Sequence, residues 1–465
     1  MQGSSFVLLA AAVLAWAQPA GVEGTWQGTL DTGTAKLRLG LHVTKNAGGY
    51  TSRLDSIDQG VMGVPVASTT FSGNTLHFEL PASGVKFEGT LSADGQEIAG
   101  TFTQGAPLPL SFKRVEKVDT VSRPQNPKPP FPYESLDVSY ENKTGGVKLA
   151  GTLTVPRGGG PFPAAIMITG SGPQDRDETI VEHKPFLVIA DYLARRGIAV
   201  LRVDDRGVGR STGNSYRATI GDMAGDVLAG VEFLKARKEI DGRHIGVIGH
   251  SEGGLIAPLA ASRSDDVAFV VMLAGPGVTL EQVLYKQGEL IRRAAGADDE
   301  AVALGRSVQE MMIGVLKSEP DEKAATEKIH AGWAKIKAGA SEAERQQLDA
   351  ADVTLNAQIR AFNAPEVRSM LSYDPAEALR KLKVPVLALN GSRDLQVPPQ
   401  QNLPPIVAAL SEGGDPDFAA VELPGLNHLF QKCNQCTVAE YASIQETFSP
   451  AALEVLGDWV VRHTR

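Results

Sequence analysis

A serine at a strand-to-helix junction is the first residue of this sequence whose setting suggests catalysis. Ser251 lies in GHSEG, after the apolar run IGVI and before the helix-forming run GLIAPLA. In such a turn the serine takes strained dihedrals, and only small residues such as Gly249 and Gly253 fit two positions to either side. The turn also brings the amide of Glu252 and a helix N-terminus to where an oxyanion would form. Ser251 is therefore the predicted nucleophile of an acyl transfer.

The same G-x-S-x-G pattern occurs a second time, at residues 209–213, with Ser211 at its centre. It follows DDRGV and continues into NSYR, so the sequence around it does not have the strand-then-helix pattern of a nucleophile turn. We predict that Ser211 is a structural loop residue.

A serine hydroxyl needs a general base, and the base needs a carboxylate that orients it. Asp394 follows the apolar run VPVLALN, and His428 follows AAVELP. Both come just after predicted strands, at the edge where open parallel sheets bind ligands, and the chain order is Ser–Asp–His. The competing carboxylates Asp374 and Asp415 are in turn-like settings that favour caps or solvated charges. His250, next to the nucleophile, is expected to point elsewhere.

An oxyanion needs a second amide donor, and the loop GSGPQDRDE after the strand AAIMIT offers candidates. Gly170 and Gly172 let the backbone come close to a substrate. The amide of Ser171, or else that of Gly172, is therefore expected to act together with that of Glu252. The charged run at 175–178 either shapes the pocket or forms a salt-bridged loop.

The elements that must position these residues alternate between strands and helices. Buried β-branched runs separated by helical patterns such as LVIADYLARRG indicate a mostly parallel, doubly wound α/β sheet. Helix-forming, charged sequence interrupts this alternation at residues 278–373, which predicts a helical cap; the alternative is a solvated helical hairpin remote from the site. The predicted strands are Val147–Val155, Ala164–Thr169, Ile198–Val203, His244–Ile248, Phe269–Leu273, Val384–Leu389 and Ala419–Leu423.

A different pattern precedes this α/β region. Residues 21–115 contain short alternating runs such as KLRLGLHV between Gly-rich turns, which predicts an all-β, barrel-like domain of roughly eight strands. Residues 116–133 include RPQNPKPPFPY, whose five prolines disfavour helix and central strand. We expect this segment to be a linker to an α/β domain at residues 134–465.

Together ITGSGPQDRDETI, LRVDDRGVGRSTG, GHSEGG, NGSRDLQVPP and GLNHLFQ resemble the α/β-hydrolase superfamily, and more narrowly the bacterial serine carboxylesterases with an N-terminal β domain. The resemblance implies an α/β-hydrolase fold with a helical cap, and hydrolysis of small, short-acyl esters without metal or cofactor. The family's catalytic residues correspond to Ser251, Asp394 and His428. The shared triad leaves two alternatives, a peptidase of the prolyl-oligopeptidase kind and a thioesterase, although residues 21–115 are too few for a propeller.

The only two cysteines, Cys433 and Cys436, follow His428 within eight residues. A metal site would need three or four ligands, and a redox dithiol would need a thioredoxin-like unit, so the sequence favours neither. Thr437 and Glu440 have the spacing of a capping box, which predicts a helix just after Cys436. We expect a local disulfide that stiffens the loop carrying the histidine.

Net charge and hydropathy limit the classes of binding partner and the cellular location that we expect for the protein. The net charge of −9 argues against nucleic acid and against an anionic membrane surface, which need a basic patch. The apolar run Phe6–Trp16 is too short to span a bilayer, and Ala15-Trp16-Ala17 has the small-x-small pattern of a signal-peptidase site. Residues 1–17 are thus expected to direct export to the periplasm or the extracellular space. We expect no stable membrane span, and the oligomeric state stays open.

Overall fold

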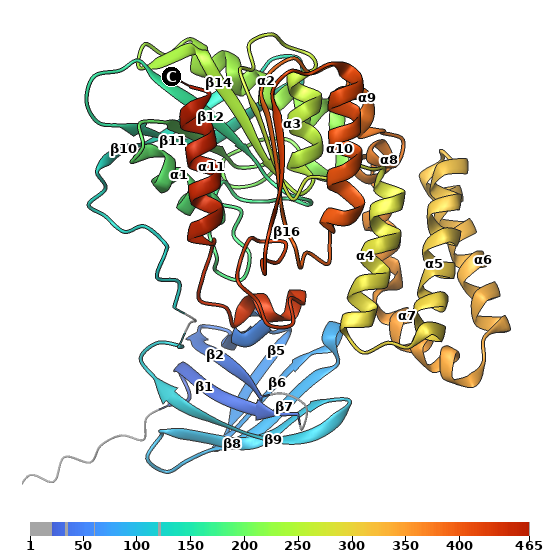
Figure 1. Ribbon diagram of the computed structural model, residues 1–465. Coiled ribbons are helices and arrows are strands. Elements are labelled where there is room, and N and C mark those ends of the chain that lie inside the picture. The colour runs from blue at the N-terminus through green and yellow to red at the C-terminus, as the bar shows by residue number, and fades with distance from the viewer. Residues whose placement is uncertain (1–20, 33–35, 60, 120–121, 465) are drawn as a thin grey trace, which may run out of the picture. The chain divides into compact units, whose positions relative to one another are not determined.

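The computed structural model describes residues 21–32, 36–59, 61–119 and 122–464. The predicted signal peptide lies outside these ranges. The chain divides into two units, Met1–Val121 and Ser122–Arg465 (Figure 1). Each unit has a hydrophobic core of its own.

Alternating apolar and polar residues build the first unit, as in β7 (Val85–Leu91), where every second side chain is buried. Within the described residues, nine antiparallel strands form one sheet in the order β4-β3-β2-β1-β9-β8-β7-β6-β5, one strand more than predicted. The sheet curls until the hydroxyls of Ser52 and Thr69 lie 2.7 Å apart, around a core that includes Trp26, Phe78, Phe87 and Phe112. The remaining strands are β1 (Gly24–Asp31), β2 (Lys36–Asn46), β3 (Gly49–Ser56), β4 (Val61–Pro65), β5 (Ser68–Ser72), β6 (Thr75–Leu80), β8 (Glu97–Gln104) and β9 (Ala106–Val115).

Buried apolar strands build the second unit. Its sheet has eight strands among the described residues, in the order β10-β11-β13-β12-β14-β15-β16-β17. The pairs β10–β11 and β11–β13 are antiparallel and the others are parallel, which is the arrangement of the α/β-hydrolase fold. The strands are β10 (Tyr133–Asn142), β11 (Val147–Pro156), β12 (Phe162–Ile168), β13 (Ala199–Val203), β14 (Ile240–His250), β15 (Val270–Leu273), β16 (Val386–Gly391) and β17 (Phe418–Leu423).

The edge strand β10 is absent from the sequence-based prediction, which places its first residue, Tyr133, in the linker. The strand pairs with β11 through its whole length, from Tyr133 opposite Pro156 to Asn142 opposite Val147. Its sequence YESLDVSYEN is only half buried, as an edge strand allows, and lacks the continuous apolar run that marks the inner strands.

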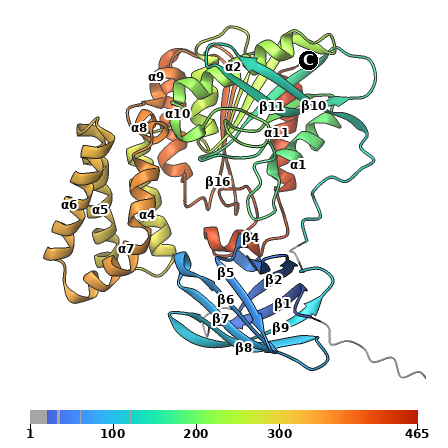
Figure 2. The same cartoon turned by 180° about the vertical axis from the view of Figure 1, so that it is seen from behind.

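Helices cover both faces of this sheet (Figures 1 and 2). Successive residues of β12 face opposite sides, so Ile166 and Ile168 belong to one core and Ala165 and Met167 to the other. The first core includes side chains of α2 (Ile220–Lys235), α3 (Gly253–Ala261), α9 (Pro375–Leu379) and α10 (Pro399–Gly413), and the second those of α1 (Pro185–Ala194) and α11 (Pro450–Arg462).

The predicted helical segment, residues 278–373, contains five helices, with a core around Met312, Ile329, Trp333 and Ile359; α9 follows it before β16. The segment is tied to the sheet domain where the Ile220 amide at the start of α2 donates to the Ser369 hydroxyl (2.9 Å). The helices are α4 (Leu280–Ala294), α5 (Asp299–Ser318), α6 (Glu322–Gly339), α7 (Glu342–Phe362) and α8 (Pro365–Leu371).

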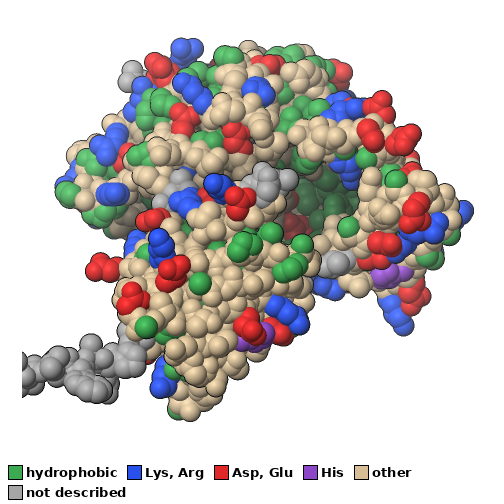
Figure 3. Space-filling view, turned by 90° about the horizontal axis from the view of Figure 1, so that it is seen from below, with side chains coloured by type: hydrophobic (Ala, Val, Ile, Leu, Met, Phe, Trp, Pro, Cys, Tyr) green, Lys and Arg blue, Asp and Glu red, His purple; other side chains and the backbone are tan. Residues whose placement is uncertain are grey.

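Charged side chains of both signs are interspersed over the face seen in Figure 3. Among the helices of the described ranges, none combines the length and the apolar character that crossing a membrane requires.

Candidate active site

The predicted nucleophile sits at a sharp turn between β14 and α3. Ser251 follows the last residue of β14, has a φ of +52°, and donates its amide to the Leu273 carbonyl of β15 (2.8 Å). A Cβ on Gly249 would lie 1.9 Å from the Gly253 carbonyl oxygen, and one on Gly253 would lie 2.2 Å from the Ile168 carbonyl oxygen. Glycine is therefore required on both sides of the turn, as the sequence pattern predicts.

The two other predicted triad residues form a buried pair. Nδ1 of His428 lies 2.7 Å from Oδ2 of Asp394, and the two residues are 4% and 3% exposed. Because a carboxylate only accepts, Nδ1 carries the proton and Nε2 is left as the proton acceptor. Oδ1 of Asp394 accepts the amides of Gln396 (2.8 Å) and Val397 (2.9 Å), which holds the carboxylate in place.

The predicted oxyanion loop, residues 169–174, has some amides that are engaged and others that are available to a substrate. The Gly170 amide donates to Oε1 of Glu178 (2.7 Å), so it is already engaged. Among the hydrogen bonds of the described residues, the amides of Ser171 and Glu252 have no protein acceptor. These two amides are the pair that the sequence favours, and the donor pair stays a prediction.

A carboxylate beneath the oxyanion loop holds it to the end of β13. Oδ1 of Asp205 accepts the Thr169 hydroxyl and Oδ2 accepts the Gln174 amide, both at 2.8 Å. The Asp205 amide donates back to the Gln174 carbonyl (3.1 Å). The loop is thus fixed at both ends by one residue.

The charged run after this loop is largely the salt-bridged loop that the sequence allows. Arg176 pairs with Asp204 (2.6 Å), and Asp177 pairs with the buried Arg202. Its last member, Glu178, turns inward instead and is 1% exposed. There it meets Nδ1 of His250 at 2.9 Å, a contact that sequence reasoning did not identify.

A cavity with about 630 Å³ of empty space, open solvent included, adjoins the oxyanion loop and has acidic and apolar walls. The carboxyl of Glu252 lines it, is 7% exposed, and has no hydrogen-bond partner among the described residues. Burial, together with the charges of Glu366 and Asp205, raises the pKa of Glu252 to about 8. Burial also raises the pKa of Asp205 to about 7, although the Gln174 amide and the Thr169 hydroxyl oppose this. The apolar lining includes Leu149, Ile166, Met223, Val227 and Ile256.

The residues that the sequence assigns to structural roles lie in such positions. Ser211 is buried, donates to the Asp204 carbonyl (2.7 Å) and accepts the Ala150 amide (2.9 Å). Asp374 caps α9 by accepting the Ala376 amide (3.0 Å). Asp415 accepts the Asp417 amide (3.0 Å) in a turn before β17.

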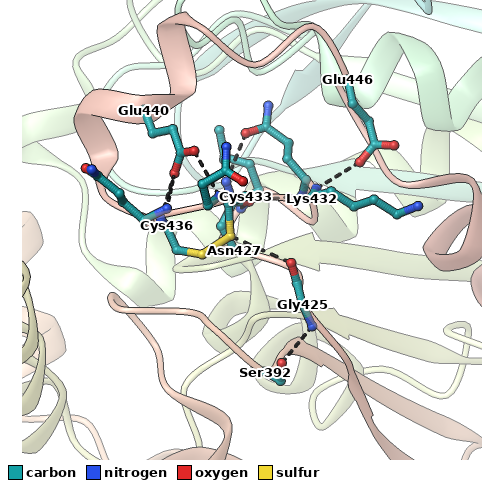
Figure 4. The surroundings of a disulfide bond; sticks show 12 residues. Ser392, Gly425, Asn427, Lys432, Cys433, Cys436, Glu440 and Glu446 are labelled. Atoms are coloured by element: carbon teal, nitrogen blue, oxygen red, sulfur yellow. Dashed lines mark hydrogen bonds between the residues drawn. A yellow bond between two sulfur atoms is a disulfide. The ribbon is translucent and has the colours of Figure 1, made fainter.

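The predicted disulfide between Cys433 and Cys436 is present (Figure 4). The predicted capping box is wrong: the Thr437 side chain makes no cap, and the following element is a short 3₁₀ helix, η4 (Val438–Ala442). The carboxylate of Glu440 instead accepts the amides of Asn434, Gln435 and Cys436 at 2.9, 2.9 and 2.6 Å. These three amides lie in the disulfide loop, so the glutamate and the disulfide hold the same segment.

Comparison with known proteins identifies the family. A family model described as serine aminopeptidase, S33, matches residues 183–431, more than half of the chain. The chain belongs to this family. The matched range of the S33 member contains Ser251, Asp394 and His428, and it ends two residues before the disulfide.

Esterase EstD of Thermotoga maritima is 30% identical to this S33 family member over 311 residues, which are 66% of this chain and 64% of that protein. The chain thus matches less than two thirds of the relative's length. Among solved structures, an esterase of Pyrococcus furiosus is 19% identical (75% of this chain, 100% of that chain, TM-score 0.42). A hypothetical protein of Pseudomonas aeruginosa is 20% identical (75% and 100%, TM-score 0.44).

The close backbone contacts at the turn predict the effect of one added methyl group. In Gly253→Ala the new Cβ meets the Ile168 carbonyl. We expect a loss of about 1–3 kcal/mol in the free energy of unfolding. We also expect a fall in kcat of about 10²-fold, because Ser251, the predicted nucleophile, would shift. Gly314→Ala in α5, where no atom lies within 4 Å of the new Cβ, is the control. The free energy of unfolding of the control should rise by about 0.5–1 kcal/mol. If urea unfolding and turnover gave the same values for both variants, the steric explanation would be contradicted.

The raised pKa of Glu252 predicts a pH-dependent stability. Between about pH 4.5, where an exposed glutamate ionises, and the folded-state pKa of about 8, only the unfolded chain loses this proton. The folded state therefore loses stability as the pH rises. Glutamine does not ionise, so this contribution is absent in Glu252→Gln. The free energy of unfolding of the variant relative to the wild type should therefore rise by up to about 1.4 kcal/mol per pH unit in this range. Urea unfolding at several pH values measures this difference, with Glu454→Gln on the exposed side of α11 as the control. If the free energies of unfolding of Glu252→Gln and the wild type changed in parallel with pH, the prediction would be refuted.

Proposed function

We propose that this protein is a serine carboxylesterase that hydrolyses small, short-acyl esters through Ser251, His428 and Asp394. The observation that carries the proposal is the buried 2.7 Å pair of His428 and Asp394, in the same domain as a serine at a nucleophile turn. The name of the Thermotoga maritima relative, an esterase, supports it. The Asp394 carboxylate orients the ring of His428, and the backbone amides of Gln396 and Val397 hold that carboxylate.

Acylation would begin when Nε2 of His428 takes the proton of the Ser251 hydroxyl as its oxygen attacks the ester carbonyl carbon. The carbonyl oxygen becomes an oxyanion, which the free amides of Ser171 and Glu252 are available to stabilise. Collapse of this intermediate breaks the bond to the alkoxy group, and the imidazolium of His428 gives its proton to the leaving alcohol. Asp394 keeps the ring in one tautomer throughout.

Deacylation repeats these steps with water. His428 takes a proton from a water molecule, the hydroxide attacks the acyl-Ser251 carbonyl, and the same two amides receive the oxyanion. The carboxylic acid leaves as the proton returns to the serine oxygen.

We also propose that the protein is exported to the periplasm or the extracellular space. The sequence of residues 1–17 and the Cys433–Cys436 disulfide support this, since disulfides persist in oxidising compartments.

A peptidase is the second candidate, because the family description names an aminopeptidase. The triad and the oxyanion amides serve esters, thioesters and amides alike, so only the leaving group and the pocket distinguish these activities. Turnover of matched ester and anilide substrates separates them.

The central prediction concerns Ser251→Ala. With p-nitrophenyl acetate and butyrate we expect the variant to lose at least about 10⁴-fold in kcat, because the nucleophile is gone. Ser211→Ala is the matched control, since it alters the other G-x-S-x-G serine and should keep turnover per folded molecule. Octanoate and palmitate esters size the acyl pocket, and a dipeptide anilide tests the peptidase. Ester turnover that survives in Ser251→Ala would refute the nucleophile, and turnover of the anilide alone would refute the esterase.

A further inference from the structure

His250 lies at the end of β14, directly before the nucleophile, and both of its ring nitrogens are engaged. Nε2 lies 3.0 Å from the main-chain carbonyl oxygen of His428, and Nδ1 lies 2.9 Å from Oε1 of Glu178. His250 is 5% exposed, and its ring centroid lies 4.8 Å from that of His428. The ring thus joins β14 directly to the loop that carries His428, which we call the base loop.

Glu178 extends this connection to the oxyanion loop. The oxygen that meets His250 also accepts the Gly170 amide at 2.7 Å, one residue before the predicted donor Ser171. Glu178 has a φ of +51°, an unfavourable conformation for a glutamate, which the surrounding structure imposes. A single carboxylate oxygen therefore bridges His250 and the oxyanion loop.

The partners indicate the charge of this pair. A carbonyl oxygen only accepts, so Nε2 of His250 carries a proton. The other nitrogen faces a carboxylate. Burial disfavours the imidazolium, but the charge of Glu178 and the hydrogen bonds to Glu178 and to the His428 carbonyl raise the pKa of His250. The raised pKa favours the imidazolium form, in which both ring N–H groups donate and the contact with Glu178 is an ion pair.

We infer that the buried Glu178–His250 ion pair is a positioning device, which holds the base loop and the oxyanion loop in register with Ser251. This inference rests on the proposed function. Neither residue is assigned contact with the substrate: His250 acts through the backbone of His428, and Glu178 acts through the backbone of Gly170. Displacement of either loop by about 1 Å would slow the chemical step far more than it would weaken substrate binding.

Two substitutions at His250 separate the two contacts. The amide nitrogen of glutamine reaches about as far as Nε2, so His250→Gln can keep the donor to the His428 carbonyl while losing Glu178. The amide nitrogen of asparagine reaches about as far as Nδ1, so His250→Asn can keep the donor to Glu178 while losing the base loop. Glu178→Gln keeps the shape of the network but removes its negative charge, and serves where a histidine variant does not fold.

His183 supplies the matched control. It is fully buried, its Nε2 lies 2.9 Å from the Tyr441 carbonyl oxygen, and its Nδ1 lies 3.0 Å from the Thr447 hydroxyl. Burial lowers the pKa of His183 to about 4, so this histidine is neutral. His183→Gln alters comparable hydrogen bonds in the same domain, and neither partner, Tyr441 or Thr447, belongs to the oxyanion loop or to the loop that carries His428.

The experiment counts competent sites by labelling to completion with a fluorophosphonate and then measures kcat per labelled site. We expect kcat per site to fall by about 10- to 100-fold in His250→Gln, His250→Asn and Glu178→Gln, with KM changed by less than about threefold. In His183→Gln, kcat per site should equal that of the wild type. A lower count of labelled sites with unchanged kcat per site would show that the ion pair only stabilises the fold, and would overturn the inference.

The rate of labelling gives a second readout that does not depend on the substrate. Fluorophosphonate attack needs the same base and the same oxyanion amides, so it should slow in the same three variants. If the wild type is labelled at Ser251 but turns over none of the esters, the proposed esterase fails, and the labelling rates still decide the role of the ion pair. Equal labelling rates in wild type and all three variants would contradict it.

Discussion

The left-handed conformation of Ser251 is the constraint on which the rest of the hydrolase unit depends. A non-glycine residue at such a φ costs roughly 1–2 kcal/mol, so the surrounding chain must hold it there. β14 carries the serine, the carbonyl of Leu273 at the end of β15 accepts its amide, and Gly253 starts α3 against the carbonyl of Ile168 at the end of β12. These three strands are neighbours in the sheet. The nucleophile turn is therefore a consequence of strand order.

Carboxylates hold the loops that complete the site. Irregular loops leave backbone amides without the partners that helices and sheets provide, and each such amide must find an acceptor. Asp205 and Glu178 accept amides of the oxyanion loop, Asp394 accepts two amides beyond its own position, and Glu440 accepts three in the disulfide loop. Hydrogen bonds to charged groups are the stronger kind, about 1.5–3 kcal/mol each. The loops around the predicted triad can thus be rigid without regular secondary structure.

The sequence predicts those parts of the site that depend on local pattern. Ser251, Asp394 and His428 each follow an apolar run that forms a strand, so the strand ends could be located from the sequence. The parallel sheet then predicted that the loops of Asp394 and His428 meet, as their hydrogen bond shows. Glu178 belongs to a charged run that is typical of a surface loop, and its inward turn depends on a backbone conformation set by tertiary contacts. The contacts of His250 could not be predicted for the same reason, since both partners are distant in sequence. At Thr437–Glu440 the capping-box pattern was present, but the amides of the disulfide loop bound the glutamate instead.

The most direct test is a crystal structure of the protein after reaction with a small fluorophosphonate. The account predicts phosphorus bonded to Oγ of Ser251, with the phosphoryl oxygen about 2.7–3.1 Å from the amides of Ser171 and Glu252. Phosphorus on another residue, or a phosphoryl oxygen that neither of these amides contacts, would contradict it.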